Sequence, residues 1–309
     1  MNSIPTRMKD LIQAGILAAA LVLLPCVSQA SIVLTDDFTG ASSVGSGNAT
    51  YVASATNWYS INSNGAGTQA VLTGGGSPSP IAGNFLQFGG SSSNSFVVGS
   101  FAGVTLSTPG QSLTLTLNYC YSGAPTSGSA FLGLYNDNGS AVAANSYASQ
   151  ASILGHEGYK VNKLAVLGTS DLSVVGSTVA AGAPYFSGGT TLTTSSTGVT
   201  PLVNTVYSET LTLTLAPNGT SLLIDSTFGV VGGATFSTTE QTIASPLTLT
   251  FDEIVFSPAS GGNGVTKMDN VLLTSVFPEP SITAMFALGL LGIVALRRYR
   301  SRSRYSSCA

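Results

Sequence analysis

Strict alternation of apolar and polar residues marks the middle of this chain. Leucine and threonine alternate over residues 113–117 and again over 211–215. Because successive side chains of a β-strand point to opposite faces, each segment predicts a strand with one buried and one solvated face. No stretch between residues 31 and 276 keeps a convincing helical spacing. Further strands are predicted over 32–38, 85–88, 95–106, 130–135, 160–167 and 267–276.

Local signals between the strands predict a hairpin and a bulge. The sequence Ala-Pro-Asn-Gly at 216–219 precedes another apolar run, and Asn-Gly tolerates the positive φ angles of a hairpin turn. Phe251 and Ile254 belong to apolar runs of opposite parity. The change of parity predicts a β-bulge near Asp252 and Glu253.

Many short strands separated by Gly, Ser and Pro predict an all-β fold for residues 31–276. The expected architecture is an antiparallel β-sandwich of jelly-roll type. A body of this length can bury an adequate core without disulfides or metals. Residues 73–80 and 180–200 have the weakest pattern, so we expect long surface loops there.

The tail combines an apolar segment with a basic end. Residues 281–296 contain two polar side chains, and as a helix they would span roughly 24 Å. This is shorter than the ~30 Å core of a bilayer, so a membrane-spanning helix would need snorkelling flanks. The arginine cluster predicts a cytoplasmic end for such a helix, and it argues against the alternative of a buried core helix. The arginines are Arg297, Arg298, Arg300, Arg302 and Arg304.

Three elements of this tail occur in a specific order at residues 277–304. The tripeptide Pro278, Glu279 and Pro280 is followed by the apolar segment and then by the arginines. This arrangement resembles the PEP-CTERM sorting signal of bacterial exported proteins. The resemblance implies that the tripeptide is recognised by exosortase, a membrane-embedded peptidase, while the helix holds the protein in the inner membrane. It also implies a destination at the cell surface or in the extracellular matrix of exopolysaccharide-producing bacteria.

The beginning of the chain resembles a secretory signal peptide. A weakly basic start is followed by an apolar run over 14–24, and Ser28 and Ala30 are small residues before a predicted cut. The domain boundaries expected are therefore 1–30 for the signal peptide, 31–276 for the ectodomain and 277–304 for the sorting signal. An uncleaved N-terminal anchor is the alternative for the first segment.

The charge and cysteine content of residues 31–276 argue against a nucleic-acid partner and against an internal disulfide. This region holds 11 acidic residues and 3 lysines, a balance that argues against DNA or RNA as a partner. Cys120 is its single cysteine, so no internal disulfide is expected. Low charge with abundant Ser, Thr, Asn and Gly suits a hydrated matrix, and equally suits a surface protein under few constraints.

The residues do not form a recognised catalytic motif. His156 is the single histidine, which excludes a histidine-cluster metal site, and no nucleophile elbow lies near it. We expect it in a turn. Asp252 and Glu253 are the carboxylates considered for glycoside hydrolysis, but adjacent residues of a regular strand face opposite ways. The protein is therefore expected not to be an enzyme.

Two sets of residues are candidates for binding. The segments 34–38 and 267–273 resemble the first and last strands of concanavalin-A-like and carbohydrate-binding-module sandwiches, which implies that they lie side by side. Pairing would bring together oxygen ligands for a structural calcium ion, although ordinary polar residues at strand ends explain them as well. These ligands are Asp36, Asp37, Asp269 and Asn270.

Trp58 and Tyr59 are the candidate sugar-binding aromatics, with burial in the core as the alternative. The sequence thus predicts an exported surface or matrix protein with a non-catalytic structural role and no required cofactor. Its alternative is a carbohydrate-binding module for exopolysaccharide, and a glycoside hydrolase ranks third.

Overall fold

The computed structural model describes the strands of the chain and the turns that join many of them. Among the described residues there is no α-helix, and no helix is long and apolar enough to cross a membrane. The predicted membrane helix over 281–296 lies outside these residues. The described residues are 29–38, 58–62, 68–73, 81, 84–89, 95–123, 129–143, 153–164, 172–179, 189–195, 202–257 and 266–278.

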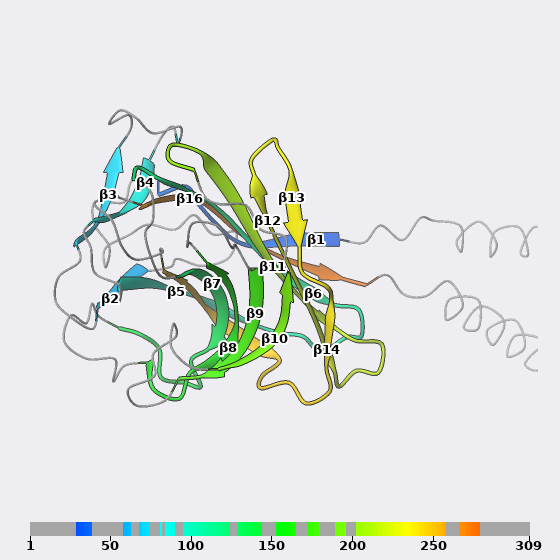
Figure 1. The fold of residues 1–309 in the computed structure, drawn as a ribbon. Helices are drawn as coiled ribbons and strands as arrows, with labels where there is room; N and C mark the ends of the chain where they lie inside the picture. The colour runs from blue at the N-terminus through cyan, green and yellow to red at the C-terminus, as the bar shows by residue number, and fades with distance from the viewer. Residues whose placement is uncertain are drawn as a thin grey trace, which may run out of the picture. The chain divides into compact units, whose positions relative to one another are not determined.

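All strands belong to one compact unit, Ala30–Phe277, apart from the first residue of β1. They form two sheets (Figure 1). The nine-stranded sheet contains β1 (Gln29–Asp36), β3 (Thr68–Thr73), β4 (Asn84–Gly89), β6 (Ser112–Tyr121), β11 (Val206–Leu215), β12 (Leu222–Val230), β13 (Thr235–Ser237), β14 (Gln241–Ile243) and β16 (Thr266–Phe277). The seven-stranded sheet contains β2 (Trp58–Asn62), β5 (Ser95–Thr105), β7 (Ser129–Asn136), β8 (Glu157–Leu164), β9 (Leu172–Thr178), β10 (Thr190–Ser195) and β15 (Thr250–Ser257).

Strands that are distant in sequence lie next to each other in both sheets. The order is β13-β12-β11-β6-β16-β4-β3 in the larger sheet and β10-β9-β8-β7-β15-β5-β2 in the smaller one. Every ladder with an assigned register among the described residues is antiparallel. The predicted antiparallel sandwich is confirmed. The predicted loop over 180–200 is wrong in part, because β10 lies within it and pairs with β9.

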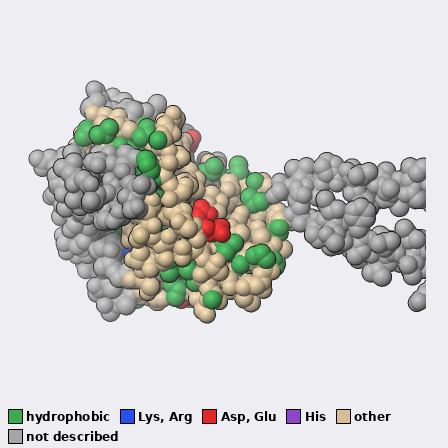
Figure 2. Space-filling view, turned by 45° about the vertical axis from the view of Figure 1, so that its right-hand side comes forward, with side chains coloured by type: hydrophobic (Ala, Val, Ile, Leu, Met, Phe, Trp, Pro, Cys, Tyr) green, Lys and Arg blue, Asp and Glu red, His purple; other side chains and the backbone are tan. Residues whose placement is uncertain are grey.

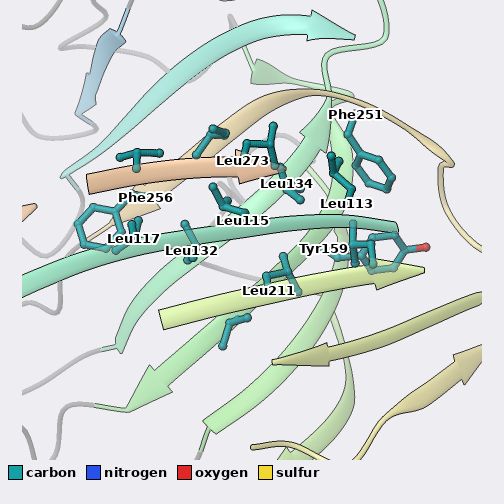
Figure 3. Packing of buried hydrophobic residues seen from close by; sticks show 14 of the residues in the cluster. Leu113, Leu115, Leu117, Leu132, Leu134, Tyr159, Leu211, Phe251, Phe256 and Leu273 are labelled. Carbon is teal, nitrogen blue, oxygen red and sulfur yellow. The ribbon is translucent and has the colours of Figure 1, made fainter. Parts of the chain in front are cut away.

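The core lies between the two sheets and consists largely of the residues that the alternation assigns to one face. In β6 and β11 the leucines are buried and the threonines are half-buried on the other face. They meet side chains of the smaller sheet, among them Leu132, Leu134 and Phe256 (Figure 3). Each fully buried leucine of this kind contributes about 2 kcal/mol through removal of apolar surface from water.

The predicted bulge and hairpin are both present. The register of β15 against β5 shifts between Phe251 and Glu253, so that Phe251 and Ile254 both reach the main core. Val255 packs instead into a second apolar cluster with Phe96 and Phe131. At the hairpin between β11 and β12, Gly219 has a φ of 72° and its amide donates to the carbonyl of Ala216 at 2.9 Å.

The first and last strands of the body pair with each other. β1 lies against β16, as the resemblance implied, and β16 lies against β6 on its other edge (Figure 1). The Ser31 hydroxyl donates to the carbonyl of Ser275 at 3.4 Å. The beginning of β1 therefore lies beside the end of β16.

Candidate functional site

Trp58 is part of the core and does not offer a surface for sugar. Its side chain is 1% exposed, and it packs against Phe38 with ring centroids 5.8 Å apart. Its indole Nε1 donates to Asp36 Oδ2 at 2.5 Å. Gly99, opposite Trp58 in β5, leaves room for the ring, because a Cβ there would lie 2.8 Å from an indole carbon. The candidate role of Trp58 in sugar binding is contradicted, and the alternative of burial in the core holds. Tyr59 is half-buried against the second apolar cluster.

Two acidic residues of the terminal strands, Asp36 and Asp269, accept hydrogen bonds from backbone amides. Asp36 Oδ1 accepts the amide of Phe38 at 2.7 Å, and Asp269 accepts the amide of Asn270 at 2.7 Å. Burial, opposed by these hydrogen bonds, raises the pKa of Asp36 and of Asp269 to about 6 each. Asp37 is exposed and adds a like charge near both.

The predicted calcium site is not assembled by these residues. Within the described ranges no three His, Cys, Asp or Glu side chains are grouped so that they could hold a metal ion. The predicted pairing of the terminal strands is confirmed. The carboxylates of Asp36 and of Asp269, however, already accept hydrogen bonds from groups of the protein. Asn270 has a φ of 53° at a break in the register of β16 against β6, so it belongs to a bulge.

His156 is buried and paired with Glu253. Its Nδ1 lies 2.8 Å from Glu253 Oε2 and its Nε2 lies 3.1 Å from the carbonyl oxygen of Ser140. Burial by itself lowers the pKa of His156, but the hydrogen bond and charge of Glu253 outweigh it and the pKa is raised. The expected turn is confirmed, because the amide of His156 donates to the carbonyl of Ile153 at 3.3 Å. The pairing of its ring with a carboxylate 97 positions away was not predicted.

The surroundings of this pair hold a turn in place. After β7 the amide of Asp137 donates to Asp252 Oδ1 at 2.9 Å, and the amide of Gly139 donates to Asp137 Oδ1 at 2.7 Å. Burial raises the pKa of Asp252 to about 6. Ser140 meets His156 Nε2 through its backbone carbonyl. The arrangement joins the β7–β8 connection to β15.

Breaking this pair is expected to destabilise the fold. His156→Leu removes the ring that pairs with the buried carboxylate of Glu253, which costs about 3 kcal/mol of unfolding free energy. The double variant His156→Leu with Glu253→Leu should lose less, because the buried carboxylate of Glu253 is removed together with its partner. Denaturant unfolding of both proteins measures this difference, with the exposed Glu240→Ala as the control. A double variant less stable than the single one would contradict this role.

A second buried carboxylate lies between the sheets. Glu209 is 0% exposed, and its Oε2 accepts the hydroxyl of Tyr119 at 2.9 Å. Burial raises the pKa of Glu209 to about 8, although the charge of Lys163 opposes this. The Lys163 ammonium lies 5.2 Å from the ring centroid of Phe228. These residues were not predicted, although Glu209 shares the parity of the buried leucines in β11 and Lys163 shares that of Val161 in β8.

The end of β16 leads directly into the predicted sorting residues. β16 ends at Phe277, and Pro278 is the next residue. Glu279, Pro280 and the arginine cluster lie outside the described residues. The family description of the PEP-CTERM protein-sorting motif matches residues 278–300. The chain carries a PEP-CTERM sorting motif. The prediction of this motif is confirmed, and the motif implies export, a C-terminal transmembrane region and handling by exosortase.

Comparison with other proteins adds no ligand. Peanut lectin with a 9mer peptide is 12% identical, with a TM-score of 0.42, and covers 72% of this chain and 99% of its own. Lectin UEA-II complexed with galactose is 12% identical, with a TM-score of 0.44, covering 79% and 99%. A carbohydrate esterase from the Shiga toxin-encoding bacteriophage phi24B is 13% identical, with a TM-score of 0.40, covering 80% and 99%. The curated proteins yielded no match. At TM-scores below 0.5 these likenesses carry no conclusion about binding, and the fold follows from the strand pairing itself.

Proposed function

We propose that this protein is a non-catalytic structural component of the cell surface or of the extracellular matrix, brought there through its PEP-CTERM motif. The observation that carries the proposal is the direct junction of that motif with the sandwich. The polar groups that first appear suited to chemistry are also engaged in holding the fold. Asp36 binds Trp58, Glu253 binds His156 and Glu209 binds Tyr119.

The outward face of the larger sheet supports a role in a hydrated medium. In its central strands the register places Thr114 beside Thr212 and Thr116 beside Thr210, and the last two hydroxyls lie 3.1 Å apart. Figure 2 shows a face of the molecule on which charged side chains are few and hydrophobic ones are scattered. Such a surface is hydrated through its hydroxyl groups and carries no strong electrostatic field. It would suit a component surrounded by exopolysaccharide, whereas binding through Trp58 is not part of the proposal because the indole is buried.

The sorting step is tested by exchanging Pro278, Glu279 and Pro280 for alanine together. In the producing bacterium the unchanged protein is expected to lose the residues after the tripeptide and to leave the membrane fraction. The triple variant should keep full length and stay in the membrane, because exosortase no longer recognises it. Intact mass and cell fractionation measure both outcomes. If the two proteins keep the tail equally, the apolar segment is a plain anchor and the proposal is wrong.

A separate experiment on the processed protein tests whether it is non-catalytic. The processed protein is incubated with the polysaccharide of the producing bacterium, and the polymer's size distribution is followed by size-exclusion chromatography. An unchanged distribution is expected. Shortening of the polymer that disappears in an Asp252→Asn variant would assign hydrolysis to the protein and overturn the proposal.

A further inference from the structure

The sorting motif has no spacer between it and the folded body. Thr274, Ser275 and Val276 of β16 pair with Thr114, Leu113 and Ser112 of β6, so the ladder continues to within two residues of Pro278. Ser275 is 2% exposed. The last residues before the motif are therefore integral to the sandwich.

Both edges of β16 are occupied at this end. β6 takes one edge, and β1 takes the other, where the hydroxyl of Ser31 reaches the carbonyl of Ser275. The backbone donors and acceptors of a strand flanked on both sides are used in the ladders. Where β6 and β1 both flank the strand, another protein can pair with it only by displacing one of them.

Proteins that bind an extended peptide commonly do so by pairing with its backbone. A peptidase acting at Pro278–Pro280 needs the residues on the N-terminal side of the motif in an extended and accessible form. In the folded body Ser275 and Val276 of this segment are paired with β6, and β1 lies along the other edge of the strand. We propose that the paired terminal strands restrict access to the motif, so that exosortase processes the chain only when the end of β16 separates from β6 and β1. This inference rests on the proposed sorting by exosortase.

The topology makes the pairing of β1 with β16, which we call the gate, a late event in folding. Ser31 and Ser275 are separated by 244 positions, and contacts of such separation carry a large loop-closure cost and form slowly. β1 is the first strand of the body and its partner β16 is the last to be exported. The motif is thus most accessible before β1 and β16 pair, and folding of the body competes with processing.

The test is a six-residue Gly-Ser linker inserted between Phe277 and Pro278 of the full-length protein. The linker gives exosortase extended chain that is free of the sheet. Pulse-chase labelling in the producing bacterium should show a processing half-time about ten-fold shorter, the factor that corresponds to about 1.4 kcal/mol of opening free energy. As the matched control, the same linker between Gly232 and Gly233, in an exposed turn, should leave the half-time unchanged.

A second variant approaches the same gate from within the fold. Leu273 of β16 is 0% exposed in the core, and Leu273→Ala weakens the docking of this strand without changing the motif. Its processing should also accelerate, and the linker should add little further to it. If the linker after Phe277 leaves the half-time unchanged or lengthens it, the gate does not exist. If the unchanged protein is not processed at all, the proposed sorting itself fails, which distinguishes the two.

Discussion

Trp58→Ala is expected to lower the free energy of unfolding by about 4 kcal/mol. The substitution removes the largest side chain of the core and leaves a void above Gly99 that the pairing of β2 with β5 cannot close. It also deprives the buried carboxylate of Asp36 of its indole donor. A buried acceptor without its partner adds a desolvation cost to the cost of the void.

Two further variants separate these causes. Trp58→Phe keeps an aromatic ring beside Phe38 but removes the hydrogen bond, so it should cost about half as much as the alanine variant. Tyr59→Ala, on the neighbouring half-buried residue, is the control and should cost the least. Urea unfolding of the purified proteins measures all three. A Trp58→Ala protein as stable as the Tyr59→Ala protein would show that the indole is not the anchor described here.

The strands could be predicted because their signal is local. In β6 and β11 a period of two in the sequence corresponds directly to burial of one face. The same holds for the bulge, since a change of parity after Phe251 requires an extra residue wherever the strand is paired. The sorting motif is local in the same sense, because order and spacing within about two dozen residues define it.

What could not be predicted depends on neighbours that are distant in the chain. An aromatic such as Trp58 belongs on one face of a strand, but only the packing of Phe38 and Asp36 decides that this face is covered. His156 has no local signal, because Glu253 becomes its partner through the order of strands in the smaller sheet. β10 is short and rich in threonine, and its pairing with β9 is what makes it a strand.

Stability is expected to fall as the pH rises from 5 to 8, with a melting temperature about 10 °C lower at pH 8. Burial is the first cause of a raised pKa in five carboxyl groups of the described residues, one of which is Asp225. The pKa is about 8 for Glu209 and about 6 for Asp36, Asp252 and Asp269. A group that binds its proton more tightly in the folded state gives its full stabilisation below the unfolded pKa, near 4, and loses it as the pH rises through the folded pKa. The stabilisation from the aspartates is therefore lost between about pH 4 and 6, and that from Glu209 is lost up to about pH 8.

His156 acts in the same direction, because its pKa is raised and its contribution is also lost with rising pH. Lys160 has a pKa lowered to about 8 by burial, so its contribution changes mainly above this range. Glu209→Gln keeps the shape of the side chain without a titratable proton, and the decline between pH 6 and 8 should become shallower in this variant. Calorimetric melting temperatures of the unchanged protein and of the Glu209→Gln variant at pH 5, 6.5 and 8 test this prediction. A melting temperature that rises toward pH 8 would mean that the buried carboxyl groups are ionised in the folded protein and paired with cations, Glu209 with Lys163 foremost.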